Sequence, residues 1–93
     1  MAILADEEIT RRVSALPGWE RKGNEIRRTY RFDSFMDAIA FVNRVAGLAE
    51  SADHHPDIDV RYDRVRLGLS THSAGGLTRR DFDLAARIDE PAS

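Results

Sequence analysis

Apolar positions near the start of the chain predict a short helix over residues 6–16. They recur every three or four residues, which is the spacing of one helical face. These positions are Ile9, Val13 and Leu16. Asp6 is expected to cap the helix, and Pro17-Gly18 is expected to end it.

A hairpin is expected next, with strands over residues 19–21 and 26–32. Gly23-Asn24 lies between them and is a pair that favours a tight turn. Side chains alternate between the two faces of a strand, so the longer strand has two distinct faces. Ile26, Tyr30 and Phe32 share one face, and Arg27, Thr29 and Arg31 share the other.

The longest helix is expected from Asp33-Ser34 to about Ser51. Apolar residues at spacings of three and four form a wide stripe, so this helix is expected to be well buried. The stripe consists of Phe35, Ile39, Val42, Val45 and Ala49, widened by Ala38, Phe41 and Leu48. After Pro56 the period changes to two, which predicts strands over residues 57–62 and 65–72 with a turn at Asp63-Arg64.

A last helix is expected to begin at Thr78, and Glu90-Pro91 is expected to end the fold. The predicted order is α-β-β-α-β-β-α, which favours the α+β class: a four-stranded antiparallel sheet with three helices on one face. The 93 residues contain no interior linker, so a single domain over residues 1–93 is expected. Two exposed sheet edges and a small core favour self-association.

Composition narrows the classes of function. Lys and Arg total 14, Asp and Glu total 16, and the formal charge is −2, which argues against a nucleic-acid-binding protein that relies on phosphate neutralisation. Cysteine is absent, which excludes disulfides, thiolate zinc sites and a cysteine nucleophile. No long apolar run and no basic leader are visible, so we expect no membrane span, no signal peptide and a cytoplasmic location.

All three histidines lie between positions 54 and 72. His54-His55 stands where the long helix gives way to a strand, and His72 stands at the end of the next strand. Pairing through Asp63-Arg64 would bring Pro56 and Asp57 near Ser70 to His72. Imidazoles have a pKa of about 6.5 and exchange protons near neutral pH, so this convergence predicts a site of acid–base chemistry.

Other interpretations of these residues stay open. His54-His55 could merely occupy the C-terminus of the helix, where cations are favoured. Thr78-x-x-Asp81 is typical of a capping box. A zinc site is disfavoured because adjacent histidines point apart and the i, i+4 ligand spacing is missing. Its candidate carboxylates would be Glu50, Asp53, Asp57 and Asp81.

Three other sequence features are weaker signals of function. Ser70 and Ser73 lie near His72, but no nucleophile, histidine and acid set can be recognised. Gly75-Gly76 lacks the spacing of a phosphate-binding loop. Several arginines between residues 61 and 80 are interleaved with aspartates between residues 57 and 83, which is typical of a solvated, paired face.

The arrangement of these residues resembles that of the pterin-4a-carbinolamine dehydratase family. The resemblance is carried by Glu50-x-x-x-His54-His55-Pro56, then Tyr62, His72 and Asp81 at fixed intervals. The stretches at 69–78 and 81–85, and Pro17-Gly18-Trp19, also resemble the family, and the likeness covers roughly residues 6–90. It implies the same α-β-β-α-β-β-α fold.

The resemblance also implies an activity: a lyase that removes water from a 4a-hydroxytetrahydropterin to give the quinonoid dihydropterin, without a cofactor or metal of its own. His54, His55 and His72 would be the catalytic residues. The substrate-binding residues would be Glu50, Asp53, Asp81, Trp19, Ser70 and Thr71. We hypothesise that His54 and His72 flank the 4a carbon as proton donor and acceptor, while His55 orients the pterin. Relatives often have an aromatic residue two positions after the proline, where this chain has Ile58.

Partners follow from the same resemblance. It implies a homodimer or homotetramer and a functional link to an aromatic amino-acid hydroxylase in tetrahydrobiopterin recycling, with neither nucleic acid nor membrane as a partner. Two alternatives stay open: a non-catalytic interaction or dimerisation module of the transcriptional coactivator type, and an accessory binder in a pterin or molybdopterin pathway.

Overall fold

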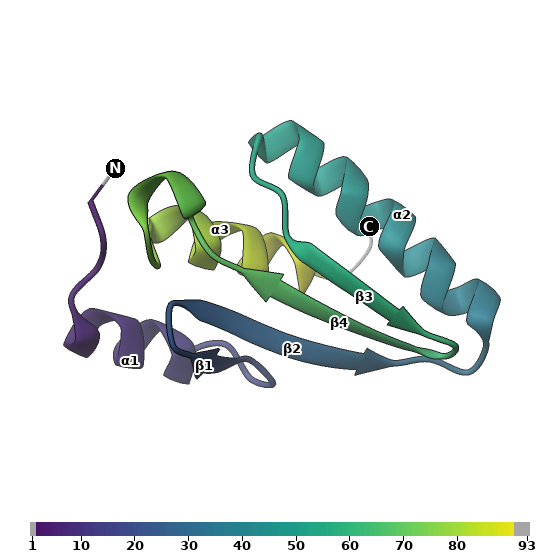
Figure 1. The fold of residues 1–93 in the computed structure, drawn as a ribbon. Coiled ribbons are helices and arrows are strands. Elements are labelled where there is room, and N and C mark those ends of the chain that lie inside the picture. Colours follow the sequence, from purple (N-terminus) through teal and green to yellow (C-terminus); the bar gives the residue numbers. More distant parts are fainter. Residues whose placement is uncertain (1, 91–93) are drawn as a thin grey trace.

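The structure, a computed structural model, describes residues 2–90 and has the predicted order of helices and strands (Figure 1). Its elements are α1 (Asp6–Ser14), β1 (Glu20–Lys22), β2 (Glu25–Arg31), α2 (Phe35–Ala52), β3 (Asp57–Arg61), β4 (Arg64–Leu69), the 3-10 turn η1 (His72–Ala74) and α3 (Arg79–Ile88). The strands form one antiparallel sheet in the order β1-β2-β4-β3, and the helices lie on one face of it. The predicted fold class is confirmed. Pro91 lies outside the described residues.

The two hairpins join through their second strands. β2 pairs with β4, so Ile26 lies opposite Leu69 at one end and Arg31 lies opposite Arg64 at the other. The predicted turn at Gly23-Asn24 is confirmed: Lys22 pairs with Glu25, and Gly23 has a positive φ of 60°. A two-residue hairpin turn favours glycine or asparagine in that left-handed conformation.

The second hairpin turns at Tyr62-Asp63, and the predicted turn at Asp63-Arg64 is wrong by one residue. The register is therefore shifted by two positions, and Asp57 lies opposite Gly68 instead of Ser70. Because side chains alternate with a period of two, this shift leaves each side chain on its predicted face. No glycine marks the turn, and Tyr62 itself takes the left-handed conformation with a φ of 55°.

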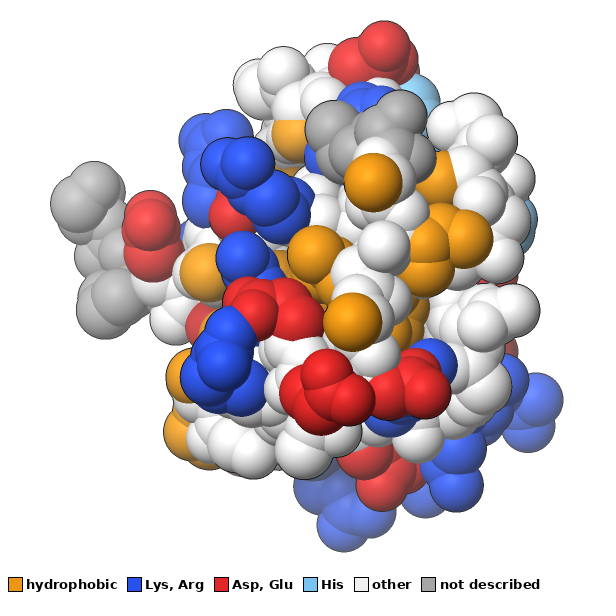
Figure 2. Space-filling model, turned by 90° about the vertical axis from the view of Figure 1, so that its left-hand side faces the viewer, with side chains coloured by type: hydrophobic (Ala, Val, Ile, Leu, Met, Phe, Trp, Pro, Cys, Tyr) orange, Lys and Arg blue, Asp and Glu red, His pale blue; other side chains and the backbone are white. Residues whose placement is uncertain are grey.

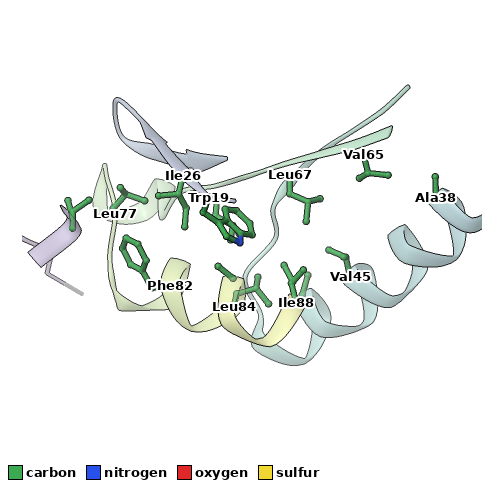
Figure 3. Packing of buried hydrophobic residues seen from close by; sticks show 14 residues of the cluster. Trp19, Ile26, Ala38, Val45, Val65, Leu67, Leu77, Phe82, Leu84 and Ile88 are labelled. Carbon is green, nitrogen blue, oxygen red and sulfur yellow. The ribbon is translucent and has the colours of Figure 1, made fainter. Parts of the chain in front are cut away.

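The core lies between the helix-facing side of the sheet and the helices α2 and α3 (Figure 3). Burial of each large apolar side chain contributes roughly 1.5–3 kcal/mol, so this layer holds α3 firmly against the sheet. The labelled side chains are Trp19, Ile26, Ala38, Val45, Val65, Leu67, Leu77, Phe82, Leu84 and Ile88. As a result, the N-terminus of α3 lies at the end of the sheet where β4 finishes.

Helix α2 begins as predicted, since the Ser34 side chain accepts a hydrogen bond from the Asp37 N–H at 3.1 Å. The prediction that this helix is well buried is wrong for the single chain. Within α2 only Ala38, Val45 and Ala49 are buried. Phe35 and Met36 are 46% and 70% exposed. The apolar composition reaches all round the helix, whereas the sheet and α3 cover only one side of it.

Helix α1 is shorter than predicted. It ends at Ser14, and its N-cap residue is Ala5, without a side-chain cap. Asp6 therefore lies in the first turn, where its charge still favours the positive end of the helix dipole. Ile9 is buried as expected.

The surface at the end of the molecule that contains α1 carries acidic and basic side chains close together, with apolar side chains between them (Figure 2). Among residues 2–90, no helix combines the length and the apolar character that crossing a bilayer requires.

Candidate functional site

The connection from α2 to β3 ends the helix abruptly and turns the two adjacent histidines apart. Asp53 takes a left-handed conformation with φ 50° and ψ 45°. The next N–H, that of His54, donates to the Ala49 carbonyl at 3.1 Å, which closes the helix end. His54 is 7% exposed, whereas His55 lies on the surface. One imidazole is thus directed into the protein and the other into solvent.

His54 forms a buried pair with Asp81. Its Nε2 lies 2.6 Å from Oδ1 of Asp81, which is 0% exposed. The second oxygen, Oδ2, accepts hydrogen bonds from the Thr71 hydroxyl at 2.8 Å and from the Thr78 N–H at 2.9 Å. A carboxylate that only accepts requires Nε2 of His54 to carry the hydrogen. Nδ1 is then the ring nitrogen that is free to exchange a proton.

Nδ1 of His54 keeps contact with solvent. Within residues 2–90, every fully buried side-chain nitrogen or oxygen has a hydrogen-bond partner, and the only bond of the His54 ring is the one from Nε2. His54 lines a hollow between the end of α2 and the side of α3. The other residues around this hollow are Ala52, Arg80, Asp83, Leu84 and Arg87. His54 therefore borders a hollow that is open to solvent.

Asp81 also caps α3, so the predicted capping box is confirmed. The Thr78 side chain accepts from the backbone of the first turn, and Asp81 accepts from the Thr78 N–H. The hydroxyl groups of Thr71 and Thr78 lie 2.7 Å apart and join the same network. The two oxygens of Asp81 bind different groups: Oδ2 anchors the carboxylate in the cap, and Oδ1 holds His54. The capping and site interpretations are compatible.

Arg80 ties the start of α3 to the end of α2. Its Nη2 donates to the carbonyl oxygens of Ala52 at 3.2 Å and Asp53 at 2.5 Å. These carbonyls belong to the last turn of a helix and lack partners within it. Arg80 was not among the predicted site residues, because its position beside Asp81 in the sequence does not indicate which carbonyls it reaches.

The other two histidines are exposed. Nε2 of His55 lies 3.5 Å from Oε2 of Glu50, and both side chains are more than half exposed, at 59% and 78%. His72 directly follows Thr71 and begins η1, so its predicted place at the end of a strand is wrong: β4 already ends at Leu69. Among residues 2–90, no hydrogen bond joins two of the three imidazoles. The arrangement thus has one buried histidine and two exposed histidines at the same end of the β3–β4 hairpin.

The remaining predicted residues differ in their surroundings. Thr71 belongs to the buried network, while Ser70 is half-buried and Asp53 and Glu50 are exposed. Thr71 is also held by its N–H, which donates to the Gly76 carbonyl at 3.0 Å and closes the loop that contains His72.

Trp19 belongs to a second polar cluster, at the other end of α3. Its Nε1–H donates to Oδ2 of Asp89 at 2.7 Å, the Tyr30 hydroxyl donates to Oδ1 at 2.5 Å, and Arg28 donates to Oδ2 at 3.1 Å. Burial, followed by the hydrogen bond to Asp89, raises the pKa of Tyr30 far above its usual value. Asp81 and Asp89 are eight residues apart, or ~12 Å along a helix. Trp19 therefore has its hydrogen bond well away from Asp81.

The described part of the chain contains no group of three or more His, Asp or Glu side chains placed to hold a metal ion. The site is instead built around one imidazole–carboxylate pair, two threonines and an arginine that braces the backbone.

Comparison with known proteins gives a consistent family. The family model described as "Pterin 4 alpha carbinolamine dehydratase" matches residues 2–91. A protein of Roseiflexus castenholzii is 63% identical over 89 residues, which covers 96% of each chain, and one of Chloroflexus aurantiacus is 58% identical over 90 residues, which covers 97% of each. Both carry provisional names as pterin-4-alpha-carbinolamine dehydratases.

Solved structures share the fold. A structure from Brucella melitensis, described as a transcriptional coactivator/pterin dehydratase, superimposes with a TM-score of 0.90 at 34% identity and covers 94% of this chain and 95% of that one. A pterin dehydratase-like protein described as a RuBisCO assembly factor in the alpha-carboxysome superimposes with a TM-score of 0.62 at 25% identity, covering 76% of this chain and 82% of that one.

Proposed function

The chain belongs to the pterin 4 alpha carbinolamine dehydratase family, and we propose that it is an enzyme that removes water from a 4a-hydroxytetrahydropterin. The product would be the quinonoid dihydropterin. The observation that carries this proposal is the buried Asp81–His54 pair, which engages only Nε2 of an imidazole whose residue borders a hollow that is open to solvent.

The reaction consists of two proton movements around one bond cleavage. The bond between the 4a carbon and its hydroxyl breaks, and the hydroxyl leaves as water after it receives a proton from an acid. The adjacent ring nitrogen gives its proton to a base, and its electron pair forms the new C=N bond. Positioned acids and bases with a pKa near neutrality typically accelerate such transfers by ~10²–10⁴.

Asp81 suits His54 to one of these transfers. A carboxylate on Nε2 holds the ring in one tautomer and stabilises the imidazolium that forms when Nδ1 takes a proton. The imidazolium can return that proton through Nδ1 in the next half of the cycle. His54 is thus proposed as a proton-transfer group that acts through Nδ1 only.

His72 and His55 are proposed for the remaining roles. His72 follows Thr71, whose hydroxyl bonds to Asp81, so its backbone is anchored to the same network while its ring stays exposed. It is the proposed second proton-transfer group. His55 with Glu50, and Asp53 and Ser70 nearby in the chain, are proposed to orient the pterin. Trp19, whose hydrogen bond lies at the other end of α3, is proposed to support the fold and not to touch the pterin.

The wider setting belongs to the same proposal. We propose a cytoplasmic enzyme of tetrahydrobiopterin recycling, active as a homodimer or homotetramer and linked to an aromatic amino-acid hydroxylase. The exposure of Phe35 and Met36 on α2 supports self-association, because large apolar side chains gain free energy when a second surface covers them.

A protein-binding role is the second candidate. The same exposed residues of α2 and the descriptions of the two structural neighbours as a coactivator and an assembly factor favour it. Such a role would use the outer side of α2 and would not need the Asp81–His54 pair. The two candidates are therefore separable by substitution.

The deciding experiment follows the ultraviolet decay of a freshly generated 4a-hydroxytetrahydropterin. We expect the purified chain to accelerate the decay, and we expect His54→Ala and His72→Ala each to reduce kcat by about 100-fold or more. The acceleration should persist in the presence of a chelator. A wild-type chain that leaves the decay at its uncatalysed rate would exclude the enzyme and favour the protein-binding role.

A further inference from the structure

The face of the sheet that points away from the helices carries a row of three arginines. Arg31 of β2 lies opposite Arg64 of β4, and Arg64 lies opposite Arg61 of β3. Alternation along the strands places all three side chains on the face opposite Val65 and Ile26, which belong to the core. This row lies at the turn end of the β3–β4 hairpin, whereas His54 precedes the start of β3.

The row is unfavourable for the fold by itself, because like charges directly opposite each other destabilise a sheet. Few carboxylates offset it. Asp59 is shared, with Oδ1 3.3 Å from Nε of Arg61 and Oδ2 3.5 Å from Nη2 of Arg66. Asp63 reaches Nε of Arg64 only at 4.0 Å. Among residues 2–90, no carboxylate lies within 4.0 Å of Arg31 in an ion pair. Positive charge therefore remains in excess here, on a chain with a net charge of −2.

A hollow lies directly beside this row. It is lined by Thr29, Asp59, Arg61, Arg64 and Arg66. Thr29 contributes a hydroxyl group, which is a further hydrogen-bond donor besides the guanidinium groups. The side chains of Arg61, Arg64 and Arg66 are 77%, 54% and 52% exposed. The donors are thus available to a ligand from solvent.

We propose that this arginine row binds a ligand with two or more linked phosphate groups, at a site separate from the His54 hollow. Guanidinium groups donate paired hydrogen bonds that match phosphate oxygens. Neighbouring strands are ~4.8 Å apart, so the three arginines form a row of closely spaced cations. Linked phosphates share a bridging oxygen and carry comparably close charges. The carboxylates on one side of an extended acidic peptide are wider apart, at ~6.6–6.8 Å.

Binding of sodium tripolyphosphate, compared with orthophosphate, tests the proposal. Isothermal titration calorimetry and amide NMR shifts on the full chain would be measured for the wild type, for Arg64→Gln and for Arg61→Gln. We expect tripolyphosphate to bind at least about tenfold more tightly than orthophosphate, because it contacts several guanidinium groups at once. Each substitution should weaken it by about tenfold or more, and added NaCl should weaken it further.

Lys22→Gln is the matched control. It removes the same charge from β1, at the opposite edge of the sheet, and should leave the affinity within about twofold. Equal affinities in the wild type, Arg64→Gln and Arg61→Gln would overturn the proposal, as would NMR shifts centred away from Arg31, Arg61 and Arg64. Dehydratase activity should be unchanged in both arginine variants, so this inference and the proposed function can fail independently.

Discussion

Nε2 of His54 and Oδ1 of Asp81 lie 2.6 Å apart, in a pair that joins the end of α2 to the first turn of α3. The same carboxylate closes the capping box of α3 through its other oxygen. A change at Asp81 therefore affects both the stability of a helix and the chemistry of an imidazole, and a suitable pair of variants separates the two effects.

Asp81→Asn is expected to lower kcat by about 100-fold or more, because an amide stabilises the His54 imidazolium less than a carboxylate does. Thr78→Ala removes the other half of the cap and should cost about 1 kcal/mol of stability, but it should lower kcat far less than Asp81→Asn does, because the contact between Asp81 and His54 remains. Activity and thermal unfolding of both variants are the measurements. Equal loss of kcat in the two variants would contradict a chemical role for the carboxylate.

Arg80 is expected to act as a positioning residue. Removal of its bonds to the Ala52 and Asp53 carbonyls should let the His54 backbone move, and a small misplacement of a proton-transfer group is costly. We expect Arg80→Ala to lower kcat by about tenfold or more, with partial recovery in Arg80→Lys, which retains one charged donor. The NMR signals of the His54 ring should shift in Arg80→Ala. Unchanged ring signals together with a lower melting temperature would reduce Arg80 to a purely structural role.

His55→Ala should separate binding from proton transfer. Its ring is exposed and lies near Glu50, outside the buried network. If it orients the pterin, its loss should raise KM several-fold while kcat falls less than in His54→Ala. Steady-state kinetics of the two variants side by side provide the comparison. A kcat for His55→Ala as low as that for His54→Ala would assign the proton transfer to both.

Tyr30 should make the protein sensitive to alkaline pH. Burial and the hydrogen bond to Asp89 raise its pKa in the folded state above the unfolded value of about 10. A raised pKa contributes stability that is fully present below the unfolded pKa and is lost as pH rises above it. Urea unfolding at pH 8 to 11 should show this decline in the wild type and a smaller decline in Tyr30→Phe. Equal slopes in both proteins would contradict the assignment.

A substitution of Tyr62 is expected to make the turn at Tyr62-Asp63 more stable. Tyr62 is 71% exposed and has a φ of 55°, a conformation that suits glycine and asparagine better than a bulky residue. Tyr62→Asn is expected to stabilise the protein by about 0.5–1 kcal/mol, and Tyr62→Val to destabilise it. Chemical denaturation of the two variants gives the sign of each effect. A destabilised Tyr62→Asn would show that the tyrosine ring makes a compensating contact.

Local sequence signals were sufficient to predict the helices and strands and several of the residues at which they begin or end. Gly23-Asn24 predicts a turn because its backbone preference is a property of two adjacent residues, and Ser34 and Thr78 predict helix starts because a cap involves neighbours only three residues away. The spacing of the apolar residues distinguishes strands from helices, because it too depends only on residues that are close together in the sequence. Asp81 was also placed correctly in its capping box.

Contacts between distant segments were not available to such signals. The register of β3 against β4 depends on a turn without glycine, so the sequence pattern placed it two positions off while keeping the correct faces. The exposure of α2 depends on how much surface the rest of the chain can cover, which an apolar stripe does not reveal.

The amino-acid sequence by itself determined the order of the elements, the faces of the strands and the family, because periodicity, turn preferences and residue spacing are encoded locally. Only the tertiary structure decided that Asp81 holds Nε2 of His54, that Arg80 braces the helix end beside it and that Trp19 bonds to Asp89. These interactions join residues 27 to 70 positions apart, and their geometry depends on how the core packs α3 against the sheet.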